Sequence, residues 1–513
     1  MNVGLAAVRS ARRTPDALAA FEGDRRLTYR ELDRRSDRLA NALRGAHGLE
    51  DGDRVALLVP NRLEVVEVLA GVAKAGLVYV GLNFRMSPSE LDQIFDNAEP
   101  KLVLTDPEHL EMAHAVADPR GLPVIDVTSD AYAGLLAQAS TRTPDSLHRV
   151  RPDDDFCIVY TSGTTGTPKG VWFDHGRVLQ HATVACLEYE LDTDSRYLTA
   201  IPHNSSVNIT LVPGLTIGAA IGFTDSRGFD PERYVAEVQQ HTITHSYLVP
   251  TQLYRLLDQV EDGDALASMV TLGYGAAPMS PDKIRALLDR FGPIFNQLYG
   301  MAEIASIGSM LRKEDHVAAA AGATHRFGSA GQPSYVVDLR VVDEAGIDVP
   351  QGERGEVIFG TPYAMKGYYR DPTRTAETLI DGWIHSGDIA EVDEDGFVYI
   401  VDRKKDLIIR GGYNISPTEI EAVLHRHPDV LEVGVIGAPD EQWGEAVLAV
   451  AVLRDGGEAT ESDLIAWCRE QGALPSVKLP EKVEFVDVLP KNAVGKVAKN
   501  ELRDRFWTGS RRV

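Results

Sequence analysis

The stretch Tyr160-Thr-Ser-Gly-Thr-Thr-Gly-Thr-Pro-Lys169-Gly170 combines glycines, hydroxyl side chains and one lysine in a single loop. Glycines let successive backbone N–H groups approach an anion, the hydroxyls add neutral donors, and Lys169 supplies a compact positive charge. Residues 156–160 and 170–173 are apolar runs that predict a strand on each side of the loop. We therefore predict a loop that binds the polyphosphate of a nucleoside triphosphate.

A flexible linker is the alternative interpretation, because stretches rich in glycine, serine and threonine often form linkers. The flanking strands argue against it, since they tether both ends of the loop. The stretch is also distinct from the common phosphate-binding motif that ends in Gly-Lys-Ser/Thr, because Pro168 precedes the lysine and Gly170 follows it.

Length, charge and cysteine content bound the class of protein. A chain of 513 residues predicts two or more domains. Its formal net charge of -24 argues against broad binding to nucleic acid, because the phosphate backbone binds clusters of basic residues. The 3 cysteines show no paired spacing, which predicts a reducing compartment without structural zinc or disulfides. No apolar run reaches the roughly 18 to 20 residues of a membrane span, so we expect a soluble, cytoplasmic protein.

The first two thirds of the chain alternate between helix and strand signals. Capping boxes at 28–31 and 87–90 predict helices, and the apolar runs 54–59 and 101–104 predict strands. Such alternation is typical of layered α/β domains with largely parallel sheets. After about Gly355 short strands such as 355–359 and 396–400 predict a small β-barrel-like subdomain.

A final small domain is predicted from Arg403 onward. The basic cluster 403–405, the pair Gly411-Gly412 and a proline-bearing capping box at 416–419 open a segment with further strands near 430–436 and 447–452. We therefore divide the chain into an N-terminal domain, 1–402, and a small α+β C-terminal domain, 403–513.

Four further motifs carry residue types that bind nucleotides. An aromatic ring can stack on a purine, a glutamate can hold Mg²⁺, and an aspartate can accept hydrogen bonds from ribose. Taken singly, each is more often a turn, a hairpin or a solvated loop. The four are Tyr299-Gly-Met-Ala-Glu303, Trp383-Ile-His-Ser-Gly-Asp388, Asp402-Arg-Lys-Lys-Asp406 and Pro490-Lys-Asn-Ala-Val-Gly-Lys496.

Together with the threonine-rich loop, in this order and over nearly the whole chain, these motifs resemble the adenylate-forming superfamily. That superfamily includes acyl-CoA synthetases, firefly luciferase and the adenylation domains of nonribosomal peptide synthesis. Within it, the sequence looks most like the fatty-acyl and aryl acyl-CoA ligases. The resemblance implies that a carboxylate attacks the α-phosphorus of ATP and expels pyrophosphate, after which the thiol of CoA displaces AMP.

The resemblance also implies roles for individual residues. Lys496 would bridge the carboxylate and the α-phosphate, and so reduce the repulsion between two anions. Glu303 and Thr161 would hold Mg²⁺, while Asp388 and Arg403 would bind the ribose. Tyr299 would bind the adenine. The remaining ATP-binding residues implied are Thr161, Ser162, Gly163, Thr164, Thr165, Gly166 and Lys169 in the phosphate loop, together with Gly275, Ala276, Ala277, Gly300, Met301 and Ala302.

Similar enzymes turn their C-terminal domain between the two half-reactions, and Lys405 falls at the hinge position. Gly411 and Gly412 then lie on the face that admits the pantetheine arm of CoA. His203 matches a histidine that gates the thioester site, although a satisfied core histidine is the alternative.

Two positions depart from the pattern of the superfamily. Ala302 stands where threonine or serine usually precedes the metal-binding glutamate, so one hydroxyl contact is missing. Asp402 stands before Arg403 where glycine is common, so we expect the turn to differ there while Arg403 keeps its ribose role.

The acid substrate is only partly predictable. In similar enzymes that activate amino acids, an aspartate in the acyl pocket pairs with the ammonium group of the substrate. Here the uncharged Asn204 lies near that place, which disfavours an α-amino acid as substrate. Tyr274 is bulky and suggests a truncated pocket for a medium-chain, alicyclic or aromatic acid, unless these residues are core groups instead. The pocket residues implied are Asn204, Ser205, Val207, Asn208, Tyr274 and Leu298.

Two other functions stay open at this point. An acyl-AMP ligase would pass the acyl group to a carrier protein in place of free CoA. A nucleotide-binding homologue without turnover would keep the fold alone. A homodimer and peripheral membrane contact also remain open.

Overall fold

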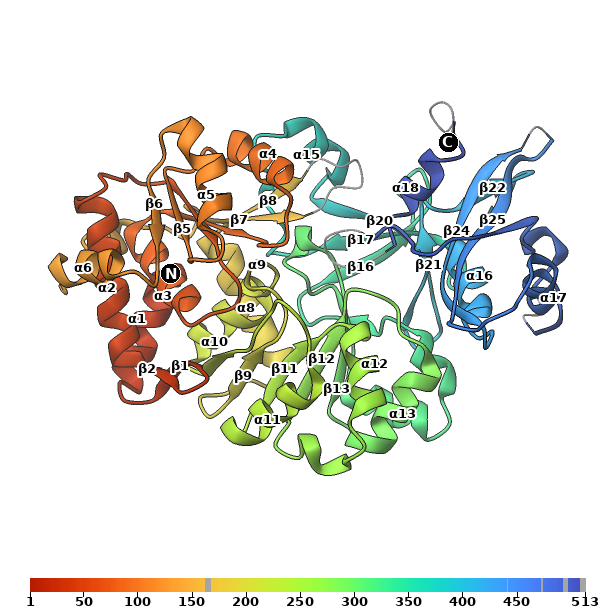
Figure 1. Cartoon of the computed structure of the whole chain (residues 1–513), viewed down its shortest axis with the longest axis horizontal. Coiled ribbons are helices and arrows are strands. Elements are labelled where there is room, and N and C mark those ends of the chain that lie inside the picture. Colours follow the sequence, from red (N-terminus) through yellow and green to blue (C-terminus); the bar gives the residue numbers. More distant parts are fainter. Residues whose placement is uncertain (162–167, 441, 472–473, 492–496, 508–513) are drawn as a thin grey trace. The chain divides into compact units, whose positions relative to one another are not determined.

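The computed structural model describes residues 1–161, 168–440, 442–471, 474–491 and 497–507. Its contacts divide the chain into two compact units (Figure 1). The first is Met1–Leu339 with Phe359–Ile384, and the second is Arg340–Ile358 with His385–Val513. The predicted α/β class, with a large N-terminal part and a smaller C-terminal part, is confirmed. Because the second unit also takes in residues before 403, the boundary of a mobile domain at 403–405 stays a prediction.

A seven-stranded sheet carries the threonine-rich loop. Its central strands are largely buried, apolar except for Arg54 and pair in parallel, as expected for a sheet covered on both faces. β7 and β8 are antiparallel neighbours, and Thr161 lies opposite Lys169 in their ladder. In sheet order the strands are β18 (Gly367–Tyr368), β8 (Lys169–Asp174), β7 (Asp155–Thr161), β4 (Val78–Leu82), β3 (Arg54–Leu58), β5 (Leu102–Thr105) and β6 (Val124–Asp126).

A nine-stranded sheet forms the rest of the first unit. Most of its strands pair in parallel, while β2, β14 and β15 run antiparallel to their neighbours. In order they are β15 (Gln332–Pro333), β14 (Ser309–Leu311), β13 (Phe295–Tyr299), β12 (Thr271–Gly275), β11 (His245–Leu248), β9 (Arg196–Thr199), β10 (Ala220–Phe223), β1 (Leu18–Glu22) and β2 (Arg25–Thr28).

Helices connect these strands, and their starts follow the sequence signals. Thr28 and Ser87 each form the predicted reciprocal capping box with the glutamate three residues on. The helices of the first unit are α1 (Val3–Arg13), α2 (Tyr29–Gly45), α3 (Glu64–Ala75), α4 (Pro88–Ala98), α5 (Leu110–Ala117), α6 (Asp130–Gln138), α7 (Ser146–Arg149), α8 (His175–Glu188), α9 (His203–Ser206), α10 (Val212–Ile217), α11 (Pro231–His241), α12 (Pro250–Gln259), α13 (Pro281–Phe291), α14 (Lys313–Ala320) and α15 (Pro372–Thr378).

The short strands predicted after Gly355 form a five-stranded sheet. Its order is β16 (Asp338–Val342), β17 (Gly355–Gly360), β20 (Trp383–Val392) and β19 (Leu379–Ile380), with β21 (Val398–Arg403) beside β20.

The C-terminal segment builds a second five-stranded sheet around its own apolar core, which includes Ile420, Val435 and Leu464. Its order is β23 (Tyr413–Ile415), β22 (Ile408–Arg410), β25 (Gly444–Leu453) and β24 (Val430–Asp440), with β26 (Lys482–Phe485) beside β25. Its helices are α16 (Pro417–Leu424), α17 (Glu461–Gln471) and α18 (Lys499–Asp504).

The predicted capping box at Ser416 is only half formed. The Ser416 hydroxyl accepts the Glu419 N–H, as predicted. The Glu419 carboxylate instead accepts a hydrogen bond from Lys478 at 2.6 Å, because a charged partner is within reach.

No helix in the described part of the chain is both long enough and apolar enough to cross a bilayer.

Candidate active site

Lys169 and Glu303 both contact Tyr368. The Lys169 ammonium lies 5.1 Å from the centroid of the Tyr368 ring, and the Tyr368 hydroxyl donates a hydrogen bond to the Glu303 carboxylate. Burial, followed by the charge of Glu303, raises the pKa of the Tyr368 phenol far above its ordinary value, so the phenol stays a donor. The arrangement follows from strand pairing, because β18 places Tyr368 beside Val171 of β8.

Both the backbone and the side chain of Glu303 are hydrogen-bonded. It lies in a short helical turn, Ala302–Ile304, directly after β13, and only 8% of the residue is exposed. Its backbone carbonyl accepts the Met365 N–H at 2.7 Å, three residues before Tyr368. The segment that holds Tyr368 therefore fixes both the backbone and the side chain of Glu303.

Two glycines of the predicted ATP site, Gly275 and Gly300, lie too close to neighbouring backbone to be replaced by a residue with a side chain. A Cβ on Gly275 would lie 2.2 Å from the carbonyl oxygen of Leu298, and one on Gly300 would lie 2.0 Å from that of Ser306. Ala276 adopts a left-handed φ of 68° directly after the first of these glycines. The Tyr299 ring lies 5.9 Å from the Phe359 ring, which limits the positions that Tyr299 can take.

His203 begins α9 and is almost wholly buried. A hydrogen bond of 2.9 Å joins its Nδ1 to the hydroxyl of Tyr79 on β4, whereas its Nε2 makes no hydrogen bond. Burial lowers the pKa of His203 to about 4, against a smaller opposing effect of the Val59 backbone, so the imidazole is neutral at pH 7.

Asn204 and Asn208 follow in the same buried segment, where α9 leads into a wider helical turn, Val207–Leu211. Both side chains are at least nine-tenths buried, and Oδ1 of each has no hydrogen-bond partner. Unsatisfied buried acceptors of this kind are costly unless a ligand or water completes them.

Tyr274 is a satisfied core group. Its hydroxyl lies 2.8 Å from Nε2 of His316 and 2.9 Å from Oε1 of Gln297, and its ring packs in an apolar core cluster of the first unit. Of the two interpretations of Tyr274 from sequence, these contacts favour the core group over a side chain that truncates the acyl pocket. Leu298, on the neighbouring strand β13, is also buried.

The second unit brings together the two residues expected at the ribose. Asp388 and Arg403 are directly opposite in the β20–β21 ladder, and Oδ1 of Asp388 lies 3.5 Å from Nε of Arg403. Asp402 is buried and accepts hydrogen bonds from the Ser416 hydroxyl at 2.6 Å and the Thr418 N–H at 3.0 Å. Asp402 therefore supports the start of α16, next to the N-cap residue Ser416.

Gly411 and Gly412 have left-handed φ angles of 56° and 86°. A Cβ on Gly411 would lie 2.7 Å from the Trp443 ring, whereas nothing lies within 4 Å of one on Gly412. Lys405 has partners of its own, and its neighbour Asp406 pairs with Arg503. Lys496, Ser162, Gly163, Thr164, Thr165 and Gly166 lie outside the described residues.

Models of two protein families match this chain. One, described as "AMP-binding enzyme", matches residues 8–369, and a second, described as its C-terminal domain, matches residues 419–496. The chain belongs to the AMP-binding enzyme family. The predicted membership of the adenylate-forming superfamily is thereby confirmed.

Named relatives of this AMP-binding enzyme differ in the acceptor of the acyl group. A feruloyl-CoA synthase of Amycolatopsis sp is 41% identical over 97% of this chain and 98% of its own length. A fatty acid–[acyl-carrier-protein] ligase of Streptomyces coeruleorubidus is 36% identical over 98% of this chain and 96% of its own. The crystal structure of ATP-bound MatB from Rhodopseudomonas palustris, 31% identical, matches with a TM-score of 0.88 over 99% of both chains.

Sequence reasoning missed Tyr368 and Tyr79 in this AMP-binding enzyme. Each orders a predicted site residue from a distant part of the chain, 65 residues from Glu303 and 124 residues from His203. A tyrosine that follows a glycine is too common to signal a role. The pairing of β18 with β8 would have identified Tyr368, but sheet order leaves no local trace in the sequence.

Among the described residues, no group of three or more His, Cys, Asp or Glu side chains could hold a metal ion by itself. A single carboxylate is nevertheless a suitable ligand for Mg²⁺, which keeps several waters and binds substrate phosphates. Glu303 and the predicted Thr161 therefore fit a magnesium ion that arrives with ATP.

Proposed function

We propose that this protein is an ATP-dependent acid–thiol ligase. It converts a carboxylic acid and ATP to an acyl-adenylate and pyrophosphate, and then transfers the acyl group to the thiol of CoA. The observation that carries the proposal is the convergence of Lys169 and Glu303 on Tyr368, in a chain of the AMP-binding enzyme family. Its named relatives, a CoA synthase among them, support the same enzyme class.

Fixed positive charge around the phosphates stabilises the transition state in which the carboxylate attacks the α-phosphorus of ATP. Lys169 supplies a point charge to the β- and γ-phosphates, and its placement over the Tyr368 ring limits where that charge can move. Glu303 holds its carboxylate ready for a cation, because the Tyr368 hydrogen bond orients it. Mg²⁺, when bound, neutralises part of the phosphate charge.

We propose an aromatic acid with a hydroxyl group on the ring as the substrate. The Oδ1 atoms of Asn204 and Asn208 are unpartnered acceptors, and a phenolic hydroxyl, which donates one hydrogen bond, would satisfy one of them. An aliphatic chain would leave both of them unsatisfied. The feruloyl-CoA synthase named above supports the same class, since ferulate carries a phenol.

His203 is assigned to the passage for the thiol. A neutral imidazole, held through Tyr79, provides a polar wall without attracting a second anion to the adenylate. Asp388 and Arg403, the hinge Lys405, the CoA face at Gly411 and Gly412, and the catalytic Lys496 keep the roles that the superfamily implies. The free thiols of all three cysteines suit the reducing cytoplasm.

The test measures AMP release, with and without CoA, over a panel of cinnamic, hydroxycinnamic, benzoic and straight-chain acids. We expect hydroxycinnamic acids to have the highest kcat/KM, and CoA to accelerate AMP release. Lys169→Met should lower the rate of adenylation about 100-fold or more, in line with the removal of a charge aimed at the transition state. The matched control is Lys101→Met, an exposed lysine at the start of a strand region.

A carrier protein is the second candidate acceptor of the acyl group, because one of the named relatives is an acyl-carrier-protein ligase. CoA and a carrier protein should therefore be compared directly. If acyl-adenylate accumulates and CoA leaves the rate of AMP release unchanged, while a phosphopantetheinylated carrier protein accelerates it, the protein is an acyl-carrier-protein ligase. Absence of pyrophosphate exchange with every acid of the panel would instead indicate a nucleotide-binding homologue without turnover.

A further inference from the structure

A cavity of about 350 Å³ in the first unit is rich in arginine. Four guanidinium groups and a single carboxylate line it, together with the start of helix α6. The residues that matter here are Arg25, Arg35, Arg38, Arg62, Glu64 and Ser129. Such a volume falls within the roughly 300–1,000 Å³ of typical small-molecule sites.

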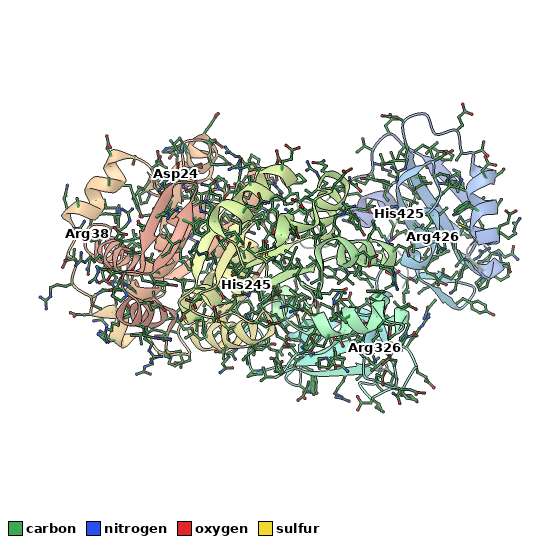
Figure 2. All side chains as sticks on the ribbon, turned by 90° about the horizontal axis from the view of Figure 1, so that it is seen from below. Asp24, Arg38, His245, Arg326, His425 and Arg426 are labelled. Atoms are coloured by element: carbon green, nitrogen blue, oxygen red, sulfur yellow. The ribbon has the colours of Figure 1, made fainter. Side chains whose placement is uncertain are left out.

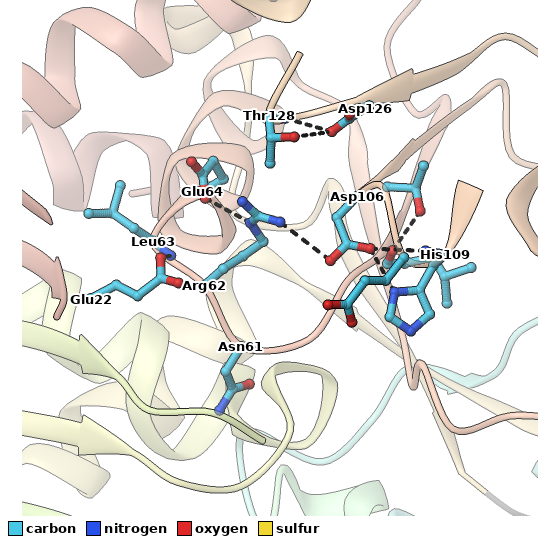
Figure 3. A network of polar contacts seen from close by, with 12 residues as sticks. Glu22, Asn61, Arg62, Leu63, Glu64, Asp106, His109, Asp126 and Thr128 are labelled. Carbon is cyan, nitrogen blue, oxygen red and sulfur yellow. Dashed lines mark hydrogen bonds and ion pairs between the residues drawn. The ribbon is translucent and has the colours of Figure 1, made fainter. Parts of the chain in front are cut away.

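Three of the four arginines already have acidic partners. Arg25 forms an ion pair with Glu64. Arg62 lies 2.8 Å from Glu64 and 3.4 Å from Asp106, and Figure 3 shows its guanidinium reaching toward both. Arg35 forms an ion pair with the buried Glu67. The carboxylates near the cavity are therefore committed to these three arginines.

Arg38 is the exception. It projects from α2 at the edge of the N-terminal part of the chain (Figure 2), and its Nε–H is covered from solvent without any acceptor. A buried donor that lacks an acceptor costs about 1–3 kcal/mol. The fold therefore keeps, beside the cavity, one guanidinium group that no acid of the described chain satisfies.

Helix α6 adds a smaller positive contribution. Ser129 caps it, and its free N–H groups carry the positive end of the helix dipole toward the cavity. The exposed Asp130 in the first turn opposes part of this effect. Because Glu64, Glu67 and Asp106 already pair with the other arginines, Arg38 supplies the unpaired charge of the cavity among the described residues.

The cavity is separate from the candidate active site. β6, which leads into α6, is the strand at one edge of the seven-stranded sheet, whereas β7 and β8 lie toward the other edge. Four strand spacings lie between β7 and β6, or roughly 19 Å.

We propose that this cavity binds the phosphate group of a small phosphorylated molecule at a second site, apart from catalysis. The guanidinium fork of Arg38, the arginine of this cavity without an acidic partner among the described residues, presents donors that match the charge and the oxygen geometry of a phosphate. The bound phosphate pairs with the charge of the Arg38 guanidinium, and the remaining volume holds the organic part of the ligand.

Inorganic phosphate is the probe, titrated into the full-length protein at constant ionic strength and followed by calorimetry and by the melting temperature. Phosphate should bind saturably and raise the melting temperature, because a ligand of the native state stabilises it. Arg38→Gln should weaken phosphate binding about 10-fold or more, through loss of a charge-assisted hydrogen bond. Arg34→Gln is the matched control, since it removes an exposed arginine from the same helix.

Two further variants make the outcome decisive. Lys169→Met should leave this phosphate binding intact, because it alters only the nucleotide loop. Arg38→Lys should retain part of the affinity, since it keeps the charge and loses the fork. The proposal is overturned if Lys169→Met abolishes binding while Arg38→Gln does not, if acetate binds as tightly as phosphate, or if phosphate has no more effect than chloride.

Discussion

The hydroxyl of Tyr368 donates a hydrogen bond to the carboxylate of Glu303, and the same ring lies beneath the ammonium group of Lys169. One side chain thus sets the position of two oppositely charged groups that flank the proposed phosphate site.

Tyr368→Phe should therefore slow adenylation. The ring remains beneath Lys169, but Glu303 loses the donor that orients it, at a cost of about 1.4 kcal/mol or 10-fold in kcat. The measurement is carboxylate-dependent pyrophosphate exchange as a function of Mg²⁺ concentration. Tyr335→Phe removes a hydroxyl from an exposed tyrosine and serves as the control. An unchanged rate and Mg²⁺ dependence in Tyr368→Phe would show that Glu303 needs no such support.

Gly300→Ala should disable ATP binding. Its Cβ would lie 2.0 Å from the Ser306 carbonyl oxygen, so the turn that carries Tyr299 must shift. We expect a loss of about 100-fold in kcat/KM for ATP, because small displacements in a positioned site are costly. Gly134→Ala places a methyl group in open space within α6 and should leave the kinetics unchanged. Circular dichroism distinguishes a local shift from failure to fold.

Asn208→Leu should change the preference between acids. Without the Asn208 amide, a phenolic hydroxyl loses a buried acceptor, so kcat/KM for a 4-hydroxycinnamate should fall about 10-fold. Cinnamate, which lacks the hydroxyl, should be accepted as well as before or better. The ratio of the two kcat/KM values is the readout, and an unchanged ratio would place the ring hydroxyl elsewhere.

Asp402→Ala should loosen the C-terminal segment. The variant leaves the Thr418 N–H without its buried acceptor, while the Ser416 hydroxyl keeps only the Val401 carbonyl oxygen at 3.0 Å. We expect a loss of about 2 kcal/mol, measured by urea unfolding and by hydrogen exchange in α16. Asp455→Ala, at an exposed turn, is the control. Equal protection of α16 in both variants would contradict the capping role.

Acid should destabilise the first unit through its buried histidines. Burial lowers the pKa of His175 and His181 to about 3 and that of His203 and His316 to about 4. The unfolded chain, with pKa values near 6.5, then binds more protons than the folded chain. Stability should be level above about pH 7 and fall as the pH drops from about 6.5 toward 4, by up to about 1.4 kcal/mol per pH unit for each such histidine.

His181→Phe isolates one contribution to this pH dependence. Both ring nitrogens of His181 lack partners, and its ring packs edge-on against Tyr363. Phenylalanine should preserve the packing, reduce the slope of stability below pH 6.5, and stabilise the protein at pH 7 by about 1 kcal/mol. His148→Phe, at an exposed position, should leave the slope unchanged. Chemical unfolding at a series of pH values gives both quantities.

Much of the fold could be predicted because its signals are local. Thr28 and Ser87 cap helices through bonds to residues three positions away, and continuous apolar runs become the buried strands β3 and β5. The half-formed box at Ser416 shows the limit of this reasoning. Lys478, 59 residues from Glu419, takes the carboxylate that the local pattern had assigned to the cap.

By itself, the sequence determined the alternating α/β architecture, the strands on both sides of the threonine-rich loop and the family to which the chain belongs, because periodicity, caps and motif order are properties of neighbouring residues. Only the tertiary structure decided that Tyr368 supports Glu303, that Tyr79 holds His203 and that the Arg38 Nε–H has no acceptor. Those relationships depend on which strands and helices become neighbours, and the balance of burial and pairing over the whole fold sets that order.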